Sequence, residues 1–276
     1  MILIADSGST KTDWCLADRG MIVSRKDTQG INPFHQDEDE INRIIIEELL
    51  PVLGDAEIDE VVFYGSGCRA EKIVPMHNLL SDLFPNSDVE INSDLIAAAR
   101  AVCGRNAGIA CILGTGSNSC FYDGTKVVTN TPPLGYILGD EGSGAVLGRL
   151  FINALYKGEL PPSIREEFTK STNLSLSDII ENVYCKPLAN RFLASLSTFI
   201  NKHIDNKQVY ELVVNNFRSF FKRNINPYGR HDVNVGAIGS IAYYYRKQLN
   251  EAAEAEGYTL SAVVRSPMDG LVKFHL

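Results

Sequence analysis

Apolar residues in the first part of the chain fall into short runs with the spacing of strands, followed by longer runs with the spacing of helices. The runs ILIA (2–5), DWCLAD (13–18) and GMIVSRKD (20–27) predict three strands, the second antiparallel to the first. In residues 37–53 the isoleucines and leucines recur at near-helical spacing, which predicts an amphipathic helix.

Strands and helices then alternate along the chain. A buried-type strand at 60–65 precedes a helix at 70–84, and a strand at 88–92 precedes a helix for which Ser93 is the expected N-cap. Because a strand–helix–strand succession brings the chain back in the same direction, these strands are predicted to pair in parallel. The pattern therefore predicts an α/β fold.

The opening pattern recurs later in the chain. Residues 109–130 repeat the order of residues 1–25: an apolar strand, a Gly/Ser/Thr turn, a second strand, a short DG or RG turn and a third strand. A solenoid would need a shorter period and more copies, so the repeat indicates duplication of one unit. We expect two domains, at residues 1–107 and 108–276.

The second predicted domain contains a long helical segment. After it, a strand and glycine turn at 233–240, a helix at 241–257 and a last strand at 260–267 lead to a short terminal helix or tail. The helices predicted within the segment are residues 143–156, 175–185, 188–204 and 209–225.

Composition limits the classes of partner. The chain has 276 residues, 45% of them hydrophobic, and a net charge of −8 with scattered Lys and Arg residues, which disfavours nucleic acid as a partner. No signal sequence is visible, and no apolar run approaches the ~20 residues that cross a bilayer. We expect a cytoplasmic protein with no membrane partner. The six cysteines include no Cys-x-x-Cys pair and are predicted to be reduced thiols, most of them buried.

A turn rich in small residues, DSGSTKT at 6–12, follows the first predicted strand. Phosphoryl transfer needs main-chain N–H groups around phosphate oxygens, and small residues let the backbone approach an anion. The turn also offers hydroxyls, a lysine and a carboxylate that could hold metal-bound water, although it lacks the glycine spacing of a Walker loop. A phosphate cradle and an ordinary hairpin turn both fit this stretch.

Three later turns are also rich in glycine. LGTGSNS (113–119) has the matching place in the repeat, so the two turns could hold one phosphate chain from two sides. GYILGDEGSGAVLGR (135–149) contains a helix start, whose free N–H groups suit an anion, although its acids also fit ordinary capping. VGAIGSIA (235–242) could approach a base or ribose, or be a routine strand–helix turn.

Asp94 stands where a predicted strand ends and a predicted helix begins. Ligands of open α/β sheets bind at the carboxyl ends of parallel strands. A carboxylate there can take the proton of a sugar hydroxyl. A favourable partner for the helix dipole is an equally good interpretation of this residue.

In order along residues 6–240, the motifs DSGSTKTDW, QGINPF, SDLIAAA, LGTGSNS, GYILGDEGSG and VGAIGS resemble the sugar kinases of the actin-like superfamily. That superfamily includes hexokinases, acetate kinase and heat-shock chaperone ATPases. The chain most resembles the N-acetylglucosamine kinases, which are grouped with the BadF/BadG/BcrA/BcrD-type ATPases. The resemblance implies two duplicated ribonuclease-H-like domains with ATP in a cleft between them.

The resemblance also implies an activity, the ATP-dependent phosphorylation of N-acetylglucosamine at its 6-hydroxyl. Asp94 would be the general base, and Asp6 would hold Mg²⁺. The residues implied to bind Mg-ATP are Asp6, Gly8, Ser9, Thr10, Lys11, Thr12, Gly114, Thr115, Gly116, Gly236, Gly239 and Ser240. The residues implied to bind the sugar are Asn32, Ser66, Ser117, Asn118, Gly135 and Asp140.

Some family features are missing. The zinc-bearing Cys–His cluster of the related repressor/kinase group is absent, no helix-turn-helix segment precedes residue 1, and the chain is short for the group. Glucosamine and N-acetylmuramic acid therefore stay open as alternative acceptors. The sequence also permits a homodimer.

Three rival functions fit parts of the sequence. Gly65, Gly67 and Ala70 match a dinucleotide-binding fingerprint, which leaves LGTGSN and GDEGSG unexplained. The ATPase activators of 2-hydroxyacyl-CoA dehydratases share the superfamily and use an iron–sulfur cluster, for which Cys68 or Cys103 could be ligands, but the required spacing is not evident. A non-catalytic sugar or nucleotide sensor would have no need for the base Asp94.

Overall fold

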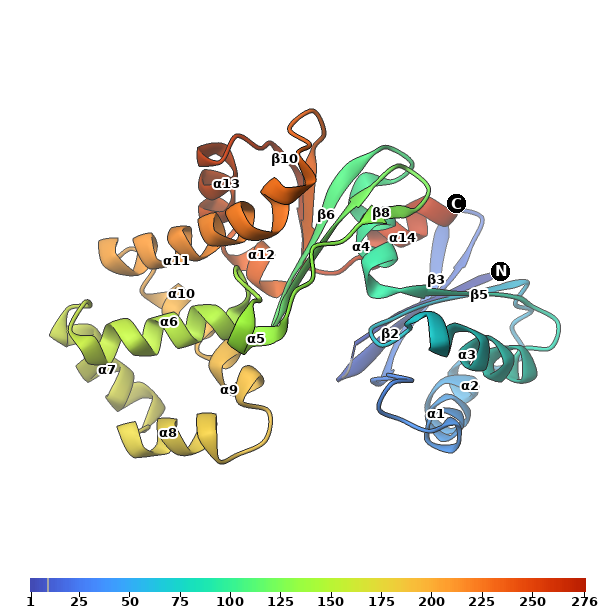
Figure 1. The fold of residues 1–276 in the computed structure, drawn as a ribbon. Helices are drawn as coiled ribbons and strands as arrows, with labels where there is room; N and C mark the ends of the chain where they lie inside the picture. Colours follow the sequence, from blue (N-terminus) through green and yellow to red (C-terminus); the bar gives the residue numbers. More distant parts are fainter. Residues whose placement is uncertain (9) are drawn as a thin grey trace. The chain divides into compact units, whose positions relative to one another are not determined.

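The computed structural model describes residues 1–8 and 10–276, and the chain divides into two compact units (Figure 1). Unit 1 comprises Met1–Arg105 with Pro267–Leu276, and unit 2 comprises Asn106–Ser266. The sequence-based boundary after residue 107 lies two residues from the first division. It differs in the last ten residues, Pro267–Leu276, which pack with unit 1 although they follow unit 2 in the chain.

Unit 1 is built on a mixed five-stranded sheet in the order β3-β2-β1-β4-β5. The first three strands are antiparallel neighbours, whereas β4 and β5 run parallel to β1. This is the pairing predicted from the strand–helix alternation. The strands are β1 (Ile2–Ser7), β2 (Lys11–Asp18), β3 (Met21–Gln29), β4 (Glu60–Gly65) and β5 (Asp88–Ser93).

Helices cover both faces of this sheet. Leu3 and Ala5 of β1 join a core cluster with residues of α1 and α3, while Ile2 and Ile4 join a second cluster with residues of α4 and α14. The alternation follows from the two-residue period of a strand. The helices are α1 (Glu38–Ile44), continued by a π-helical turn (Ile45–Leu49) into α2 (Leu50–Leu53), then α3 (Ala70–Leu83), α4 (Asp94–Cys103) and α14 (Met268–His275).

Unit 2 repeats the same sheet. Its order, β10-β9-β6-β7-β8, is that of unit 1 read from the other edge, with the same antiparallel and parallel pairings. The predicted duplication is therefore confirmed. The strands are β6 (Gly108–Leu113), β7 (Ser117–Tyr122), β8 (Val127–Thr129), β9 (Val235–Ile238) and β10 (Leu260–Val264).

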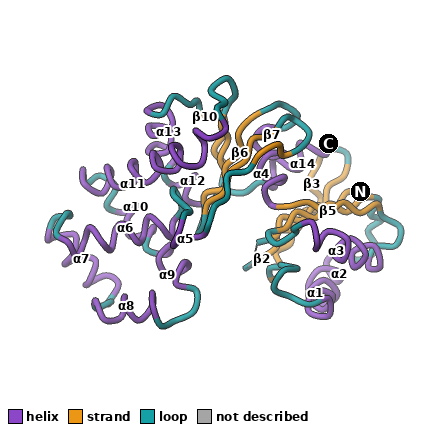
Figure 2. Tube along the Cα trace, viewed as in Figure 1, coloured by secondary structure: helices purple, strands orange, loops and turns teal. Residues whose placement is uncertain are grey.

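A run of helices, from α5 to α11, separates β8 from β9 along the chain of unit 2. Figure 2 draws these helices in purple. Two of the helices, α5 and α7, were not predicted. Pro162 begins α7 where a proline is favourable, but the helix buries only Ile164 and Phe168, so its apolar pattern is weak. The helices of unit 2 are α5 (Gly135–Leu138), α6 (Gly144–Lys157), α7 (Pro162–Thr172), α8 (Leu176–Tyr184), α9 (Ala189–Ser195), α10 (Ser197–Lys202), α11 (Lys207–Phe220), α12 (Ser240–Tyr244) and α13 (Arg246–Ala255).

Among residues 1–8 and 10–276, no helix has both the length and the apolar composition that crossing a bilayer requires.

Candidate functional site

The first predicted phosphate turn is the tip of the β1–β2 hairpin. Gly8 and Thr10 are exposed there, and the Gly8 N–H donates a 3.0 Å hydrogen bond to the Lys11 carbonyl. Apart from its chain neighbours, the nearest described atom to a Cβ built on Gly8 is the Lys11 carbonyl oxygen at 3.8 Å, so the described residues leave room for an incoming group beside Gly8. The Lys11 ammonium is exposed and forms a 3.1 Å ion pair with Asp27. Ser9, also predicted here, lies outside the described residues.

Thr12 has a different environment from the rest of this turn. Its side chain is buried, and its hydroxyl lies 2.6 Å from the Ser7 hydroxyl. The Ile31 N–H donates to both hydroxyls, at 3.1 Å each. Thr12 therefore holds the hairpin against the chain that leads to Asn32, and its hydroxyl is already hydrogen-bonded.

Two residues predicted at the sugar, Asn32 and Ser66, lie next to each other in unit 1. The Ser66 N–H donates a 2.9 Å hydrogen bond to the carbonyl of Ser7 at the end of β1. Gly67 has φ +90°, and a Cβ at this position would come 2.1 Å from Oδ1 of Asn32. The positive φ favours glycine at this position, and the close approach of Asn32 places its side chain beside the loop that carries Ser66.

Two predicted carboxylates meet at the carboxyl ends of the parallel strands. Ser7, Gly65 and Ser93 are in register across β1, β4 and β5, so Asp6 lies just before this edge and Asp94 just after it. Ser93 caps α4 as predicted, accepting a 3.4 Å hydrogen bond from the Ile96 N–H. The strand register thus places both carboxylates at the same edge of the sheet.

Both carboxyl groups have raised pKa values. Burial raises the pKa of Asp6 to about 7, with further contributions from the charges of Asp13 and Asp94. Burial raises the pKa of Asp94 to about 6, although hydrogen bonds from the main-chain N–H groups of Leu95 and Asp94 itself lower it. The charge of Asp94 thus acts on the protonation of Asp6, and two carboxyl groups with raised pKa values at one sheet edge suit acid–base chemistry.

Asp6 was also predicted to hold a metal ion. Within residues 1–8 and 10–276, no three His, Cys, Asp or Glu side chains are arranged to hold one. Mg²⁺ usually keeps several waters and takes only one or two carboxylates. Asp6 makes no salt bridge among the described residues, and its carboxylate interacts unfavourably with Asp13 and Asp94, so a hydrated divalent cation fits this position.

The second predicted phosphate turn joins β6 to β7 in unit 2. The Gly114 N–H donates to the Gly116 carbonyl at 3.0 Å, which closes the turn. The Gly144 and Ala145 N–H groups at the start of α6 donate to the carbonyls of Gly114 and Thr115, at 2.9 and 3.1 Å. The start of α6 therefore supports this turn through main-chain hydrogen bonds.

The expectation of free N–H groups at the start of α6 is wrong for these residues. Besides Gly144 and Ala145, the Gly142 N–H donates to the Asn216 side chain at 3.1 Å, and the Ser143 N–H donates to the Asp140 carbonyl at 3.0 Å. Main-chain donors that would suit an anion are used inside the unit instead.

Asp140 lies at the centre of the unit 2 residues predicted to bind sugar. It is buried, and burial raises its pKa to about 6, while N–H groups of Ser117 and Gly135 act in the opposite direction as hydrogen-bond donors. A Cβ on Gly116 would lie 2.9 Å from Oδ2 of Asp140. The tertiary structure therefore places Gly116, Ser117 and Gly135 around the Asp140 carboxylate.

Ser117 and Asn118 differ in their hydrogen bonding. The Ser117 hydroxyl is buried and has no hydrogen-bond partner among the described residues. A buried polar group without a partner costs stability, so a ligand that bonds it would be favoured. The side-chain oxygen of Asn118 already accepts hydrogen bonds from the Asn130 amide at 2.8 Å and the Ser119 N–H at 2.9 Å.

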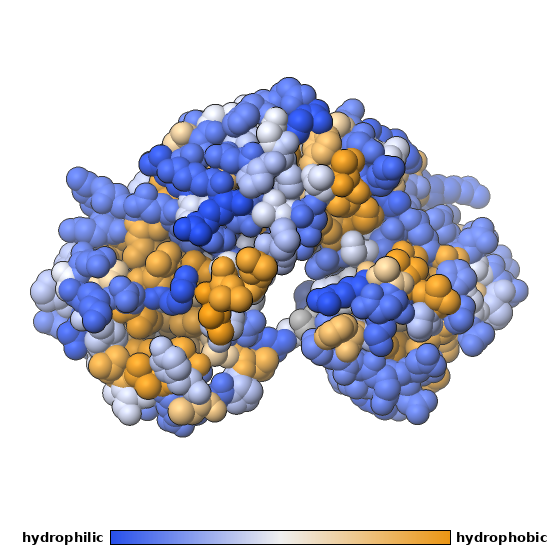
Figure 3. All heavy atoms as spheres, in the orientation of Figure 1, coloured by the Kyte–Doolittle hydropathy of each residue, from blue (hydrophilic) through white to orange (hydrophobic). Residues whose placement is uncertain are grey.

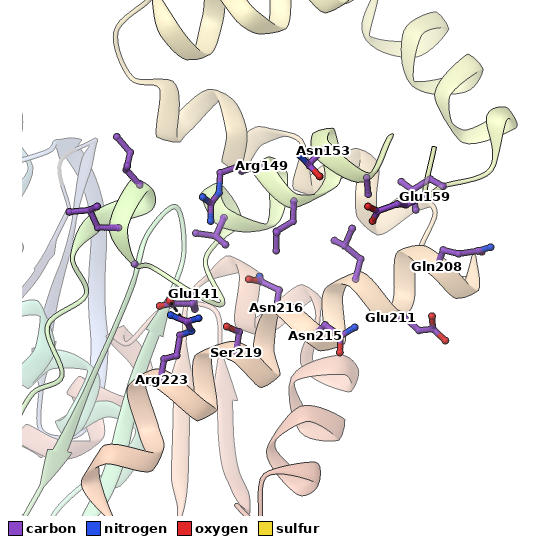
Figure 4. Close-up of a pocket in the computed structure, with 18 residues that line it drawn as sticks. Glu141, Arg149, Asn153, Glu159, Gln208, Glu211, Asn215, Asn216, Ser219 and Arg223 are labelled. Carbon is purple, nitrogen blue, oxygen red and sulfur yellow. Dashed lines mark ion pairs between the residues drawn. The ribbon is translucent and has the colours of Figure 1, made fainter. Parts of the chain in front are cut away.

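Polar residues of α11 and of the π-helical turn that follows it (Phe221–Ile225) support residues 140–143, which we call the Asp140 segment. The sequence pattern does not predict this role. Asn216 is buried and bonds both Gly142 and Ser143, while Arg223 lies 3.6 Å from Glu141. Figure 4 shows Glu141 and Arg223 together at one end of a groove between α6 and α11, with Asn216 nearby. The feature of the sequence that indicates a buried polar residue here is an asparagine inside the apolar run VVNNF.

The fourth predicted turn, between β9 and α12, is fixed by close packing. Gly239 has φ +112°, and a Cβ there would lie 2.3 Å from the Leu113 carbonyl oxygen. Gly236 is buried inside β9, paired with Ala110 on one side and Ala262 on the other. Ser240, the first residue of α12, is exposed. Of the three predicted residues, Ser240 has the side chain most open to a nucleotide.

Comparisons with known proteins gave structural matches only. No protein-family model matches the chain, and no curated protein does. A solved structure of a candidate N-acetylglucosamine kinase from Porphyromonas gingivalis matches with a TM-score of 0.95 and 50% sequence identity, over 100% of this chain and 98% of that one.

Two more distant matches share the fold. A candidate N-acetylglucosamine kinase from Chromobacterium violaceum has a TM-score of 0.70 and 16% identity, over 100% of this chain and 98% of its own. MreB 5 of Spiroplasma citri, solved with bound AMPPNP, has a TM-score of 0.56 and 8% identity, over 99% of this chain and 95% of its own.

Proposed function

Because the chain belongs to the N-acetylglucosamine kinase-like family of actin-like ATPases, we propose that it is an ATP-dependent sugar kinase. The resemblance inferred from the motifs and the predicted α/β fold of two ribonuclease-H-like units are both confirmed by the comparisons. The proposed reaction converts N-acetylglucosamine and ATP into N-acetylglucosamine 6-phosphate and ADP.

The observation that carries the proposal is the environment of Asp94. Its pKa of about 6 leaves the carboxyl group largely ionised near neutral pH, yet makes it more basic than an exposed aspartate. Asn32 and Ser66 are the neighbouring residues of unit 1 that we propose to bind the sugar. Asp94 would accept the proton of the 6-hydroxyl as its oxygen attacks the γ-phosphorus and the bond from that phosphorus to the β–γ bridging oxygen breaks, releasing ADP.

We propose that the phosphates are bound mainly by main-chain groups. The exposed hairpin tip at Gly8 and Thr10, with Lys11 beside it, and the turn from Gly114 to Gly116 supply closely approachable backbone. Asp6 would hold Mg²⁺, which would neutralise phosphate charge during transfer. Gly239 and Ser240 would contact the nucleoside.

The sugar-binding residues proposed in unit 2 surround Asp140. Its carboxylate is fixed by N–H groups from Ser117 and Gly135 and can accept hydrogen bonds from sugar hydroxyls. The unpartnered Ser117 hydroxyl supplies a further group for the same ligand. Because unpaired buried groups penalise an analogue that lacks the matching hydroxyl, this arrangement favours a polyhydroxylated acceptor.

The first test is an ADP-release assay with N-acetylglucosamine, glucosamine and N-acetylmuramic acid, and a control without sugar. We expect N-acetylglucosamine to give the highest kcat/KM. ADP release that is independent of any sugar would contradict the kinase assignment.

The second test is Asp94→Asn. We expect kcat to fall by about 10²–10⁴, the usual effect of removing a general base, with sugar binding retained in calorimetry. Asp88→Asn is the matched control, because Asp88 is an exposed aspartate at the other end of the same strand. If Asp94→Asn turns over at a rate near that of Asp88→Asn, Asp94 is not the base.

A further inference from the structure

A second concave surface of unit 2 lies between α5, α6 and α8. It encloses a volume of about 960 Å³ and is lined mainly by tyrosine, isoleucine, leucine and valine side chains. Ligand pockets typically have volumes of about 300–1,000 Å³ and a similar apolar lining. Figure 3 shows hydrophobic side chains gathered over α5 and α8 on this face. We call this surface the α8 groove.

One wall of the α8 groove is an apolar stripe along α8. Leu176, Ile180 and Tyr184 recur every fourth residue, and their exposed fractions are 48%, 48% and 77%. Ile179, also on α8, is buried against the core of unit 2. The helix therefore presents a wider apolar face than its own packing uses, and exposed apolar patches of this kind mark binding surfaces.

The charged residues that line the groove are all cations. They are Arg149 and Lys157 of α6 and Arg165 of α7, and no Asp or Glu lines the groove. Within the described residues, none of the three has a carboxylate partner, and the Arg165 guanidinium lies over the Tyr156 ring at 4.6 Å. A net positive rim around an apolar floor selects ligands that have an apolar body and a negative head.

We propose that the α8 groove binds a small amphipathic anion, a molecule with an aliphatic or aromatic body and one acidic group. The body packs against Ile180 and Tyr184, and the acidic group faces Arg149 and Arg165. The lining of this groove includes none of Gly135, Ser117 and Asp140. Binding there does not depend on the chain being a kinase.

The groove also borders the Asp140 segment. Tyr136 and Ile137 of α5 line it, and they directly follow Gly135, whose N–H hydrogen bonds the Asp140 carboxylate. A ligand in the groove therefore contacts the helix that begins at Gly135. If the proposed sugar site is correct, such a ligand acts as an effector of sugar binding, and only this consequence rests on the proposed function.

The test uses a pair of fluorescent probes that differ in charge. 8-Anilinonaphthalene-1-sulfonate has an aromatic body and a sulfonate, and N-phenyl-1-naphthylamine has the same body without it. Titrated into the full chain, the sulfonate is expected to bind one site at least roughly tenfold more tightly. Replacing the two arginines, Arg149→Gln with Arg165→Gln, leaves Lys157 as the one cation of the lining and is expected to reduce this preference to less than about threefold.

Ile180→Glu tests the location, because it places an acid on the apolar stripe. It is expected to weaken sulfonate binding at least roughly tenfold. Ile46→Glu is the matched control in unit 1, since Ile46 and Ile180 are 50% and 48% exposed. The melting temperatures of both variants are measured first, and if Ile180→Glu does not fold, the double arginine variant decides.

Three results would overturn the proposal. They are equal binding of the two probes, sulfonate binding that Ile180→Glu and the arginine replacements leave unchanged, and no sulfonate binding at all. Sedimentation of the same variants detects a second copy of the chain as the occupant, which would appear as a dimer that Ile180→Glu dissociates. Kinase assays do not enter this test, so its failure is distinguishable from failure of the proposed function.

Discussion

Three carboxyl groups, those of the partly buried Asp6 and Asp94 and of the buried Asp140, share one property at the scale of single residues. Burial raises the pKa of Asp6 to about 7 and of the other two to about 6. Keeping an ionised carboxylate in such a place costs folding stability, and a function that needs the charge is the usual reason for it. The motif resemblance had selected all three residues.

Asp6→Asn should raise stability at high pH. The folded chain holds the Asp6 proton up to about pH 7, whereas the unfolded chain releases it near 3.8, so stability falls as pH rises between these values. The neutral amide removes that cost. We expect a gain on the order of 2–4 kcal/mol in the free energy of unfolding at pH 8 and little change at pH 4.

Urea unfolding followed by fluorescence measures this effect. Trp14 is the only tryptophan of the chain and is buried in unit 1, so its signal reports on the unit that contains Asp6. Equal effects of the substitution at both pH values would show that Asp6 does not carry a raised pKa.

At the scale of elements, the start of α6 is fixed by residues from other parts of unit 2. Its first N–H groups support the Gly114–Gly116 turn, and Asn216 of α11 bonds Gly142 and Ser143 just before the helix. This arrangement holds the Asp140 segment between two elements. The positions of the proposed phosphate and sugar residues of unit 2 are therefore coupled.

Asn216→Ala should destabilise unit 2. It leaves the buried Gly142 N–H without a partner, which we expect to cost about 1–3 kcal/mol, and KM for the sugar should rise as the Asp140 segment loosens. Asn215→Ala is the control, because this neighbour on α11 is exposed and should change stability by less than about 0.5 kcal/mol. Urea unfolding followed by circular dichroism measures the free energy of unfolding of both variants. Equal losses of stability in the two variants would contradict the role of Asn216.

Gly239→Ala tests the packing of the turn between β9 and α12. The new Cβ would lie 2.3 Å from the Leu113 carbonyl oxygen and would add a clash to the positive φ. Gly229→Ala carries the conformational cost alone, about 1–2 kcal/mol, because apart from its chain neighbours no described residue lies within 4 Å of its Cβ. Gly239→Ala should therefore lose clearly more stability in thermal unfolding; a loss no larger than that of Gly229→Ala would exclude the clash.

At the scale of the whole molecule, the end of the chain completes unit 1. Met268, Leu271 and Val272 of α14 are buried with Ile2 and Ile4 of the first strand. The Tyr64 hydroxyl lies 2.7 Å from Nε2 of His275, and the Arg100 guanidinium lies over the Phe274 ring at 4.8 Å. Unit 1 is therefore assembled from both ends of the sequence.

Removing residues 267–276 should unfold unit 1. Each of the three buried apolar side chains of α14 contributes about 1.5–3 kcal/mol, so their sum is comparable to the total stability of a domain. We expect the cooperative urea transition of Trp14 fluorescence to disappear. Deleting only Leu276, which is 51% exposed, serves as the control. An unchanged transition in the longer deletion would show that α14 is dispensable.

Several features were determined by the sequence alone because they depend on neighbours in the chain. The two-residue alternation in β1 set its two buried faces, Ser93 set the start of α4, and the strand ends set the neighbourhood of Asp6 and Asp94. The repeated order of strands and turns predicted two sheets of the same topology, because pairing follows from connection length and direction.

Other features were decided only by the tertiary structure. Asn216 reaches the Asp140 segment, Gly67 packs against Asn32, and α14 returns to unit 1. The Gly144 and Ala145 N–H groups at the start of α6, which the local pattern predicts to be free, donate to main-chain carbonyls of another turn. These contacts join residues far apart in the chain, so no periodicity or local propensity marks them; they are fixed by packing and by the need to satisfy buried polar groups.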